Sequence, residues 1–262
     1  MPKFVNFQGS NAGPADKPRR GWKWIAAALL LGLMVGLLAA IAQAKSAPAG
    51  SWLASPAGGL TLKGFLVVVS LAAWFWTQAL IASRGLKDGH IGDLLHDLTA
   101  SWNTWLHTRP RVASGILIVS SAGIDLFGLF LIGAGVFGPT LRPFIALLLL
   151  FAFRQLCQAV CALPAPPKMI WRHPGFPSLL VTYSTDNDFF ISGHTAIAVL
   201  GAIEAGHLLP CGLWFAVAVA AALEGAVVIV LRAHYTMDVL GAVVAAFCAA
   251  GLAGQLCLAV GL

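Results

Sequence analysis

Residues 211–231 read CGLWFAVAVAAALEGAVVIVL, and Glu224 is the only charged residue among these 21. A helix needs about 20 apolar residues to cross the roughly 30 Å hydrocarbon core of a bilayer, so this run is long enough to span a membrane. The whole chain has the same character, because 59% of its 262 residues are hydrophobic and 10% are charged. Soluble domains carry about 25% charged residues. The composition therefore excludes an ordinary soluble domain.

Six further apolar runs lie at residues 24–42, 65–82, 112–136, 143–163, 195–209 and 239–262. Charged residues lie mainly between the runs, as in the loops of polytopic membrane proteins. The sequence predicts an all-α fold, a polytopic membrane helix bundle with seven transmembrane helices, or six if run 65–82 is re-entrant. Residues 1–23 are predicted to form a polar, basic N-terminal tail, and residues 24–262 a single transmembrane domain.

Two segments between the runs differ from simple loops. In segment 84–111, apolar residues recur at helical spacing beside acidic residues and His96, which predicts an amphipathic helix on the membrane surface or one docked against a partner helix. Its apolar stripe consists of Ile91, Leu94, Leu95, Leu98, Trp102, Trp105 and Leu106. Segment 164–191 contains five prolines, so it is predicted to be a polar loop without regular helix.

Two histidine motifs lie at the edges of apolar runs. The first reads DFFISGHT at residues 188–195, and the second reads RAHYTMD at residues 232–238. In the second motif, His234 and Asp238 are four residues apart and would share one face of a helix. A carboxylate in that position can bind the proton of one ring nitrogen and leave the other nitrogen free as a nucleophile.

In the first motif, Ser192 and Gly193 precede an apolar run, as capping residues do at a helix start, where open backbone amides attract an anion such as phosphate. His194 would lie at that end and could protonate a leaving oxygen. If the runs before and after Pro210 cross the membrane in opposite directions, His194 and His234 meet on one face. Arg154 lies about two helical turns inside the same boundary, where an arginine is costly unless it faces a polar cavity or a partner.

Together these motifs resemble those of the type 2 phosphatidic acid phosphatase superfamily, and more closely its sphingomyelin-synthase-like, C-terminal-type branch. The residues that carry the resemblance are Ser192-Gly193-His194-Thr195 with Asp188 before them, His234-Tyr235-Thr236-Met237-Asp238, and Arg154 followed by Leu163-Pro164-Ala165-Pro166. Departures from the lipid-phosphatase motifs favour the synthase-like branch: Gln155 follows Arg154, Ile191 replaces a proline, and Val228 replaces an arginine.

The resemblance implies a membrane enzyme that transfers a phospho-head group between lipids through a phosphohistidine. His234 would attack phosphorus, Asp238 would orient it, and His194 would protonate the departing oxygen. The residues implied in binding the substrate are Arg154, Ser192, Gly193, Asp188 and Arg232. No metal or other cofactor is implied. The expected partners are membrane lipids, namely a phospholipid donor and a ceramide or diacylglycerol acceptor; a nucleic-acid partner is not expected, and a homo-oligomer stays open.

Other functions remain open at this stage. Water could take the phosphoryl group, which would make the protein a lipid phosphatase or phosphodiesterase. Asp188, His194, His234 and Asp238 could instead bind zinc. Buried carboxylates at Asp125, Glu204 and Glu224 could serve an ion- or proton-coupled transporter, and Asp125 or Glu204 could form a purely structural ion pair with Arg154.

The distribution of basic residues bears on orientation. With seven spans, most Lys and Arg residues gather on the side of the N-terminus and of both histidine motifs, which favours a cytoplasmic site. The resembling family generally works on the lumenal or extracellular face with six spans, so the side stays open. We expect a multi-pass integral protein of the plasma (inner) membrane.

Overall fold

The structure is a computed structural model that describes residues 51–52, 55–82, 89, 91–181, 183 and 189–259. The predicted tail at residues 1–23 and the predicted span at residues 24–42 lie outside the described residues. Asp188, one of the predicted site residues, lies outside them as well. Within the described residues the secondary structure is helical, without strands, as the sequence predicts.

Among the described residues, five helices are long and apolar enough to cross a membrane, which identifies an integral membrane protein. They belong to α2 (Pro56–Ala82), α5 (Pro110–Phe137), α6 (Arg142–Val160), α8 (Cys211–Val230) and α9 (Thr236–Ala259). The predicted number of spans is therefore not reached in the described residues. Run 195–209 forms α7 (Gly193–Leu208), whose 16 residues are fewer than a full crossing requires. Run 65–82 lies within one continuous helix, α2.

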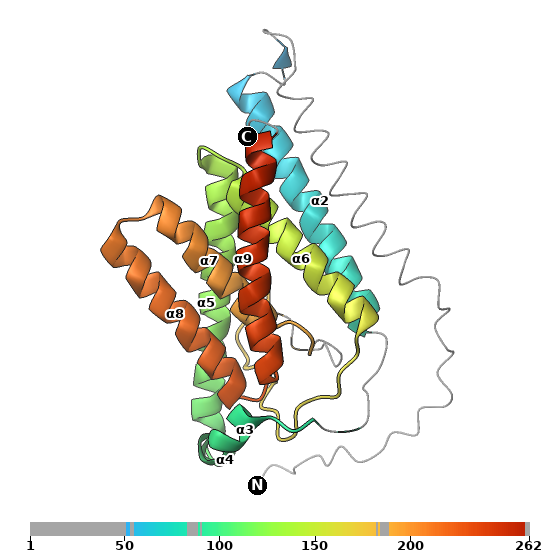
Figure 1. The fold of residues 1–262 in the computed structure, drawn as a ribbon, viewed down its shortest axis with the longest axis vertical. Coiled ribbons are helices and arrows are strands. Elements are labelled where there is room, and N and C mark those ends of the chain that lie inside the picture. The colour runs from blue at the N-terminus through green and yellow to red at the C-terminus, as the bar shows by residue number, and fades with distance from the viewer. Residues whose placement is uncertain are drawn as a thin grey trace.

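Successive long helices alternate in direction, so each helix carries the chain from one end of the bundle towards the other (Figure 1). Pro210 separates α7 from α8, because proline disfavours the helical conformation of the residue before it and Leu209 is extended. The resulting hairpin brings the start of α7 and the end of α8 to the same end of the bundle. The end of α6 and the start of α9 also lie there.

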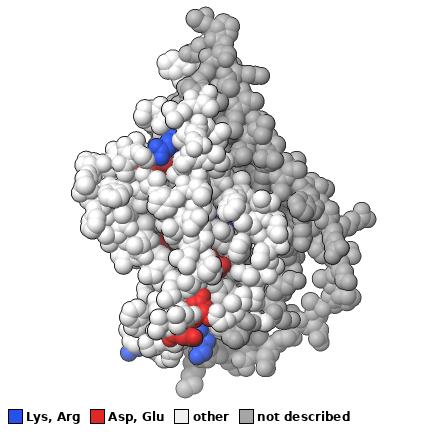
Figure 2. Space-filling view, viewed as in Figure 1, with Lys and Arg blue, Asp and Glu red and all other residues white. Residues whose placement is uncertain are grey.

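The packing of α7 and α9 against their neighbours determines where the start of α7 and the start of α9 lie. Helix α7 contacts α5, α8 and α9, and α9 also packs against α6. The buried face of α9 consists largely of alanine, including Ala242, Ala246 and Ala253, and small side chains let neighbouring helices approach closely. Large apolar side chains such as Phe215 and Phe247 face outward, as expected against lipid. On the face shown in Figure 2, most of the visible surface of the described residues carries no charge, and the charged atoms gather most densely near its lower end.

Two short helices replace a single surface helix in segment 84–111. They are α3 (Leu94–Leu98) and α4 (Ala100–His107), and they lie across the same end of the bundle (Figure 1). Leu94, Leu98 and Trp102 are exposed, whereas the polar His96 and Asn103 are buried against the bundle. Leu106 is the buried apolar residue of α4, so the two helices turn Leu106 and these polar residues inward and most of their other apolar residues outward.

The proline-rich segment folds back into the bundle between α6 and α7. Ser178 Oγ and the backbone amides of Leu179 and Leu180 donate hydrogen bonds of 2.8–3.0 Å to the carboxylate of Asp125. Asp125 lies 15 residues into α5, about 22 Å along its axis. The loop is therefore attached near the middle of a membrane helix, and it forms part of the wall of a cavity.

Candidate active site

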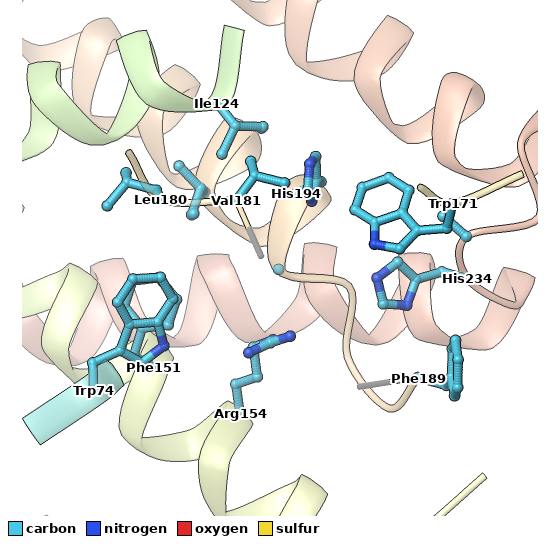
Figure 3. A pocket seen from close by; sticks show the side chains of 13 residues that line it. Trp74, Ile124, Phe151, Arg154, Trp171, Leu180, Val181, Phe189, His194 and His234 are labelled. Carbon is cyan, nitrogen blue, oxygen red and sulfur yellow. The ribbon is translucent and has the colours of Figure 1, made fainter. Parts of the chain in front are cut away.

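A cavity of about 50 Å³ lies between α2, α5, α6, the start of α7 and the turn before α9 (Figure 3). Its polar side chains are Arg154 from α6, His194 from α7 and His234 from the turn before α9. Its other lining residues are Trp74, Ile124, Phe151, Trp171, Leu180, Val181, Phe189, Gly193, Ile197 and Ala233. The structure thus brings together both predicted histidines and the predicted arginine in a site that is otherwise largely apolar.

His234 and Asp238 are close, although His234 is not helical. Helix α9 begins at Thr236, and Asp238 in its first turn accepts a hydrogen bond of 3.0 Å from the Tyr235 amide through Oδ2. This is one half of a capping box, in which the third helical residue binds the amide of the residue before the helix. The same Oδ2 lies 3.6 Å from Nδ1 of His234. The cap therefore holds the carboxylate beside one ring nitrogen of His234.

His194 is buried at the start of α7, with a relative exposure of 7%. Its Nε2 has no hydrogen-bond partner among the described residues. Burial, the neighbouring His234 and the Arg154 guanidinium lower the pKa of His194 from 6.5 to about 3. The ring of Trp171 meets it edge-on at 5.0 Å between centroids. His194 is therefore neutral near pH 7 in the free protein.

Arg154 is held against the start of α7. Its Nε donates a hydrogen bond of 3.0 Å to the carbonyl oxygen of Ile191. A methyl group at Gly193 would lie 3.3 Å from Cζ of Arg154, so glycine leaves just enough room for the guanidinium. The arginine thus lies beside the helix end whose backbone amides favour an anion.

Unusual backbone angles precede both histidines. Ile191 has a φ of 65° and Arg232 a φ of 56°, in the left-handed region that residues other than glycine rarely adopt. Proline cannot adopt this conformation, because its ring fixes φ near −65°. The replacement of the lipid-phosphatase proline by Ile191 therefore fits the local geometry. Strained backbone of this kind tends to occur at functional sites.

Sequence reasoning missed the contacts that α3 and α4 make with the His234 turn. His96 Nε2 lies 2.9 Å from the carbonyl oxygen of His234, and Asn103 Nδ2 donates to the carbonyl oxygen of Val230 at 2.9 Å. Asp93 accepts hydrogen bonds from Thr236 N and Thr236 Oγ1, both of 2.6 Å. It also caps α3 through the amides of Leu95 and His96. One carboxylate therefore caps two helices.

Hydrogen bonds affect the ionisation of Asp93. Partial burial raises its pKa, but hydrogen bonds from Thr236 and the amide of His96 outweigh this and keep the pKa below the ordinary 3.8. Asp93 is therefore ionised near pH 7, when both caps are formed. The feature of the sequence that could have indicated these contacts is the pair Asp93 and His96, three residues apart at the start of a polar helix face.

Two predicted substrate-binding residues have other contacts in the structure. Ser192 Oγ caps α7 by accepting hydrogen bonds from Thr195 N and Thr195 Oγ1 at 3.3 and 3.1 Å. Arg232 donates to the carbonyl oxygens of Pro167 and His96 at 3.2 and 2.9 Å. Neither lines the cavity, whereas Gly193 does. Arg232 thus connects the loop and α3 to the His234 turn.

The buried carboxylates also have partners. Glu204 lies 3.3 Å from Arg142 Nη2, and Glu224 accepts a hydrogen bond of 2.5 Å from Ser120. Asp125 binds the loop, so neither Glu204 nor Asp125 forms the structural pair with Arg154 that the sequence left open. The described residues contain no group of three or more His, Cys, Asp or Glu side chains arranged to hold a metal ion.

Comparison with known families assigns the chain to a family. Residues 92–255, well over half of the chain, match the model of the AtPDCT1/2 family. The chain belongs to the AtPDCT1/2 family. These are phosphatidylcholine:diacylglycerol cholinephosphotransferases, so the protein is a member of a family of lipid transferases. The match begins just before α3 and ends within α9, so it includes both histidines and the α3–α4 contacts but not α2. No curated protein and no solved structure matches the chain.

Proposed function

We propose that the protein transfers a phosphocholine head group from a phospholipid to a second lipid through a phosphohistidine at His234. The observation that carries the proposal is the shared cavity of His194, His234 and Arg154 in a member of the AtPDCT1/2 family. The sequence motifs, with their resemblance to the sphingomyelin-synthase-like branch, support the same chemistry.

In the first step, Nε2 of His234 attacks the phosphorus of the donor lipid. A phosphorus–nitrogen bond forms and the bond from phosphorus to the glycerol oxygen breaks. His194 gives its proton to that oxygen, and diacylglycerol leaves. Burial is the largest cause of the lowered pKa of His194, followed by the charges of His234 and Arg154. An anionic phosphodiester beside Arg154 would offset these two charges and so favour the protonated form of His194.

In the second step, the hydroxyl of the acceptor lipid attacks the phosphohistidine. His194 takes the hydroxyl proton as a general base, the new phosphorus–oxygen bond forms, and the bond to His234 breaks. Asp238 holds the imidazole through Nδ1, and Arg154 stabilises the charge on the phosphate oxygens. Such electrostatic stabilisation is the main contribution in phosphoryl transfer.

The family name supports phosphatidylcholine as donor and diacylglycerol as acceptor. Ceramide as acceptor would make the protein sphingomyelin-synthase-like, and water would make it a hydrolase. The structural partners of Asp125, Glu204 and Glu224 disfavour a transporter, because each carboxylate is engaged in a contact between elements of the fold.

The experiment is a product assay in liposomes of phosphatidylcholine with a fluorescent acceptor. Fluorescent diacylglycerol should become fluorescent phosphatidylcholine, and ceramide is the parallel acceptor. His234→Ala should abolish the product and Asp238→Asn should lower the rate severely, with both variants folded. His207→Ala, at the other end of α7, is the matched histidine control and should keep activity.

The outcomes separate the candidate functions. Wild-type activity in His234→Ala would end the phosphohistidine proposal. Release of phosphocholine without a lipid product would mean hydrolysis. An ion or proton flux in sealed vesicles that is lost on replacing Glu204 or Glu224, but kept without His234, would establish transport instead.

A further inference from the structure

Trp74 brings an unused hydrogen-bond donor to the active-site cavity. It lies on α2, its relative exposure is 7%, and its side chain lines the cavity with Arg154 and His234. Its buried indole Nε1 has no acceptor among the described residues. The family match begins after α2, so Trp74 lies outside the region that assigns the family.

The indole ring is fixed by its neighbours. Its centroid lies 4.8 Å from that of Phe151 and 4.7 Å from that of Phe75, in tilted arrangements. A tryptophan N–H can only donate, and a buried donor without an acceptor costs free energy. A ligand that places a neutral acceptor oxygen in the cavity would remove this cost.

The position of Trp74 indicates which part of a lipid supplies the oxygen. In Figure 3, Trp74 and Phe151 lie on one side of Arg154, and His234 and Trp171 lie on the other. The surroundings of Trp74 are apolar, since Ile124, Leu180 and Val181 also line the cavity. An ionic phosphate fits beside Arg154 and the histidines. The apolar side suits the next part of a glycerolipid, where the acyl chains join the glycerol through ester groups.

We propose that the indole N–H of Trp74 donates a hydrogen bond to an ester carbonyl oxygen of the glycerolipid that reacts at His234. The proposal rests on the proposed function, and it assigns to α2 a part in recognising the lipid backbone. Both a phospholipid donor and a diacylglycerol acceptor carry such esters. The ester carbonyl is common to both lipids, and the experiment below shows which of the two supplies the oxygen that Trp74 binds.

The test compares ester-linked with ether-linked lipids, because an ether has the same chain attachment without the carbonyl. Trp74→Phe removes the N–H and keeps an aromatic ring. Trp76→Phe, on the same helix but 50% exposed, is the matched control. Transfer is measured with diacyl or dialkyl phosphatidylcholine as donor, and separately with diacylglycerol or dialkylglycerol as acceptor.

The expected result is that wild type and Trp76→Phe prefer one ester-linked substrate by roughly three- to tenfold in kcat/KM, the effect of one hydrogen bond. Trp74→Phe should lose that preference, and its kcat/KM with the dialkyl substrate should stay within about twofold of wild type. The substrate for which the preference disappears identifies the source. An equal loss with both linkages, or a preference that survives in Trp74→Phe, would overturn the proposal.

A binding measurement keeps this test separate from the proposed reaction. For the substrate that is the source, either phosphatidylcholine or diacylglycerol, the ester-linked form should raise the unfolding temperature of detergent-solubilised wild type more than the dialkyl form does. Trp74→Phe should respond equally to both forms. If wild type shows this difference without forming a transfer product, the proposed function fails and the Trp74 contact stands. If wild type transfers the head group but binds and uses both linkages alike, the Trp74 contact fails and the proposed function stands. The wild-type comparison also decides the matter if Trp74→Phe does not fold.

Discussion

Nε2 of His96 lies 2.9 Å from the backbone carbonyl oxygen of His234. His96 is buried in the short helix α3, and its own carbonyl oxygen accepts a hydrogen bond of 2.9 Å from Arg232. Two contacts thus join one helix turn to the segment that carries the proposed nucleophile. His96 does not line the cavity, so we regard it as a positioning residue.

His96→Ala should therefore lower kcat more than it raises KM, because the His234 turn loses a fixed contact while the phosphate site remains. Misplacement of a catalytic group by about 1 Å can reduce the rate by roughly 10²-fold. His96→Gln, which retains a donor, should recover part of the rate. Thr104→Ala, at an exposed position of α4, is the control and should behave as wild type. Equal losses for the Gln and Ala variants would contradict a positioning role, and steady-state kinetics decide the question.

Gly193→Ala should lower activity without lowering stability. The added methyl group would lie 3.3 Å from Cζ and Nε of Arg154, and the guanidinium would have to shift by a few tenths of an ångström. Alanine is favoured over glycine in helices, so the unfolding temperature should stay the same or rise. Gly123→Ala on α5 meets no atom within 4 Å and serves as control. Full transferase activity in Gly193→Ala would show that the position of Arg154 is not critical.

Ile191→Pro should prevent stable folding or activity, because proline cannot adopt the φ of 65° found there. Ile191→Val keeps a branched apolar side chain and should retain most of both. The unfolding temperature in detergent and the transfer rate check the two variants. A stable, active proline variant would mean that neither folding nor activity needs a positive φ at position 191.

Acid should destabilise the protein through His194. Its pKa is about 3 in the folded state and 6.5 ordinarily, so between these values the unfolded chain binds a proton that the folded chain does not. Stability contributed by the neutral ring is therefore present above pH 6.5 and lost as the pH falls, by up to about 1.4 kcal/mol for each pH unit. His194→Gln should lose less stability than wild type between pH 7 and pH 5, as measured by thermal unfolding. If the unfolding temperatures of wild type and His194→Gln changed in parallel with pH, the lowered pKa of His194 would be refuted.

Asp93 does not interfere with this measurement. Its pKa lies below 3.8, so the stability that its ionised form adds is lost only at lower pH. Asp93→Asn should thus leave the difference between pH 7 and pH 5 unchanged.

The sequence predicts that His194 and His234 lie at the same end of the bundle, because this placement follows from the topology of the helices. Pro210 indicates a hairpin, and antiparallel helices of similar length bring His194 and His234 to the same end. Counting helical turns back from the proline-rich loop predicts that Arg154 lies near the same end. Each inference uses helix geometry alone, which periodicity and proline positions specify.

The remaining contacts depend on where side chains reach in three dimensions. Asp93 and Thr236 are 143 residues apart, and nothing local at Asp93 identifies a second helix as its partner. The family resemblance implies that Arg232 binds the substrate, but its long side chain reaches the carbonyl oxygen of Pro167. The path of the loop decides that contact, and prolines exclude a helix without specifying a path. Trp74 resembles any tryptophan in an apolar run until the cavity is seen.

The attachment of the proline-rich loop to Asp125 has a consequence for how lipids reach the cavity. If the loop detached from α5, the carboxylate of Asp125 would lose its hydrogen bonds from Ser178, Leu179 and Leu180. Hydrogen bonds to charged groups contribute about 1.5–3 kcal/mol each, so a state with the loop detached is rarely populated. Turnover that required this state would be slow, whereas a two-tailed substrate already lies in the bilayer beside the helices. We therefore expect lipids to enter and leave the cavity laterally, between the helices, while the loop stays attached to α5 throughout the catalytic cycle.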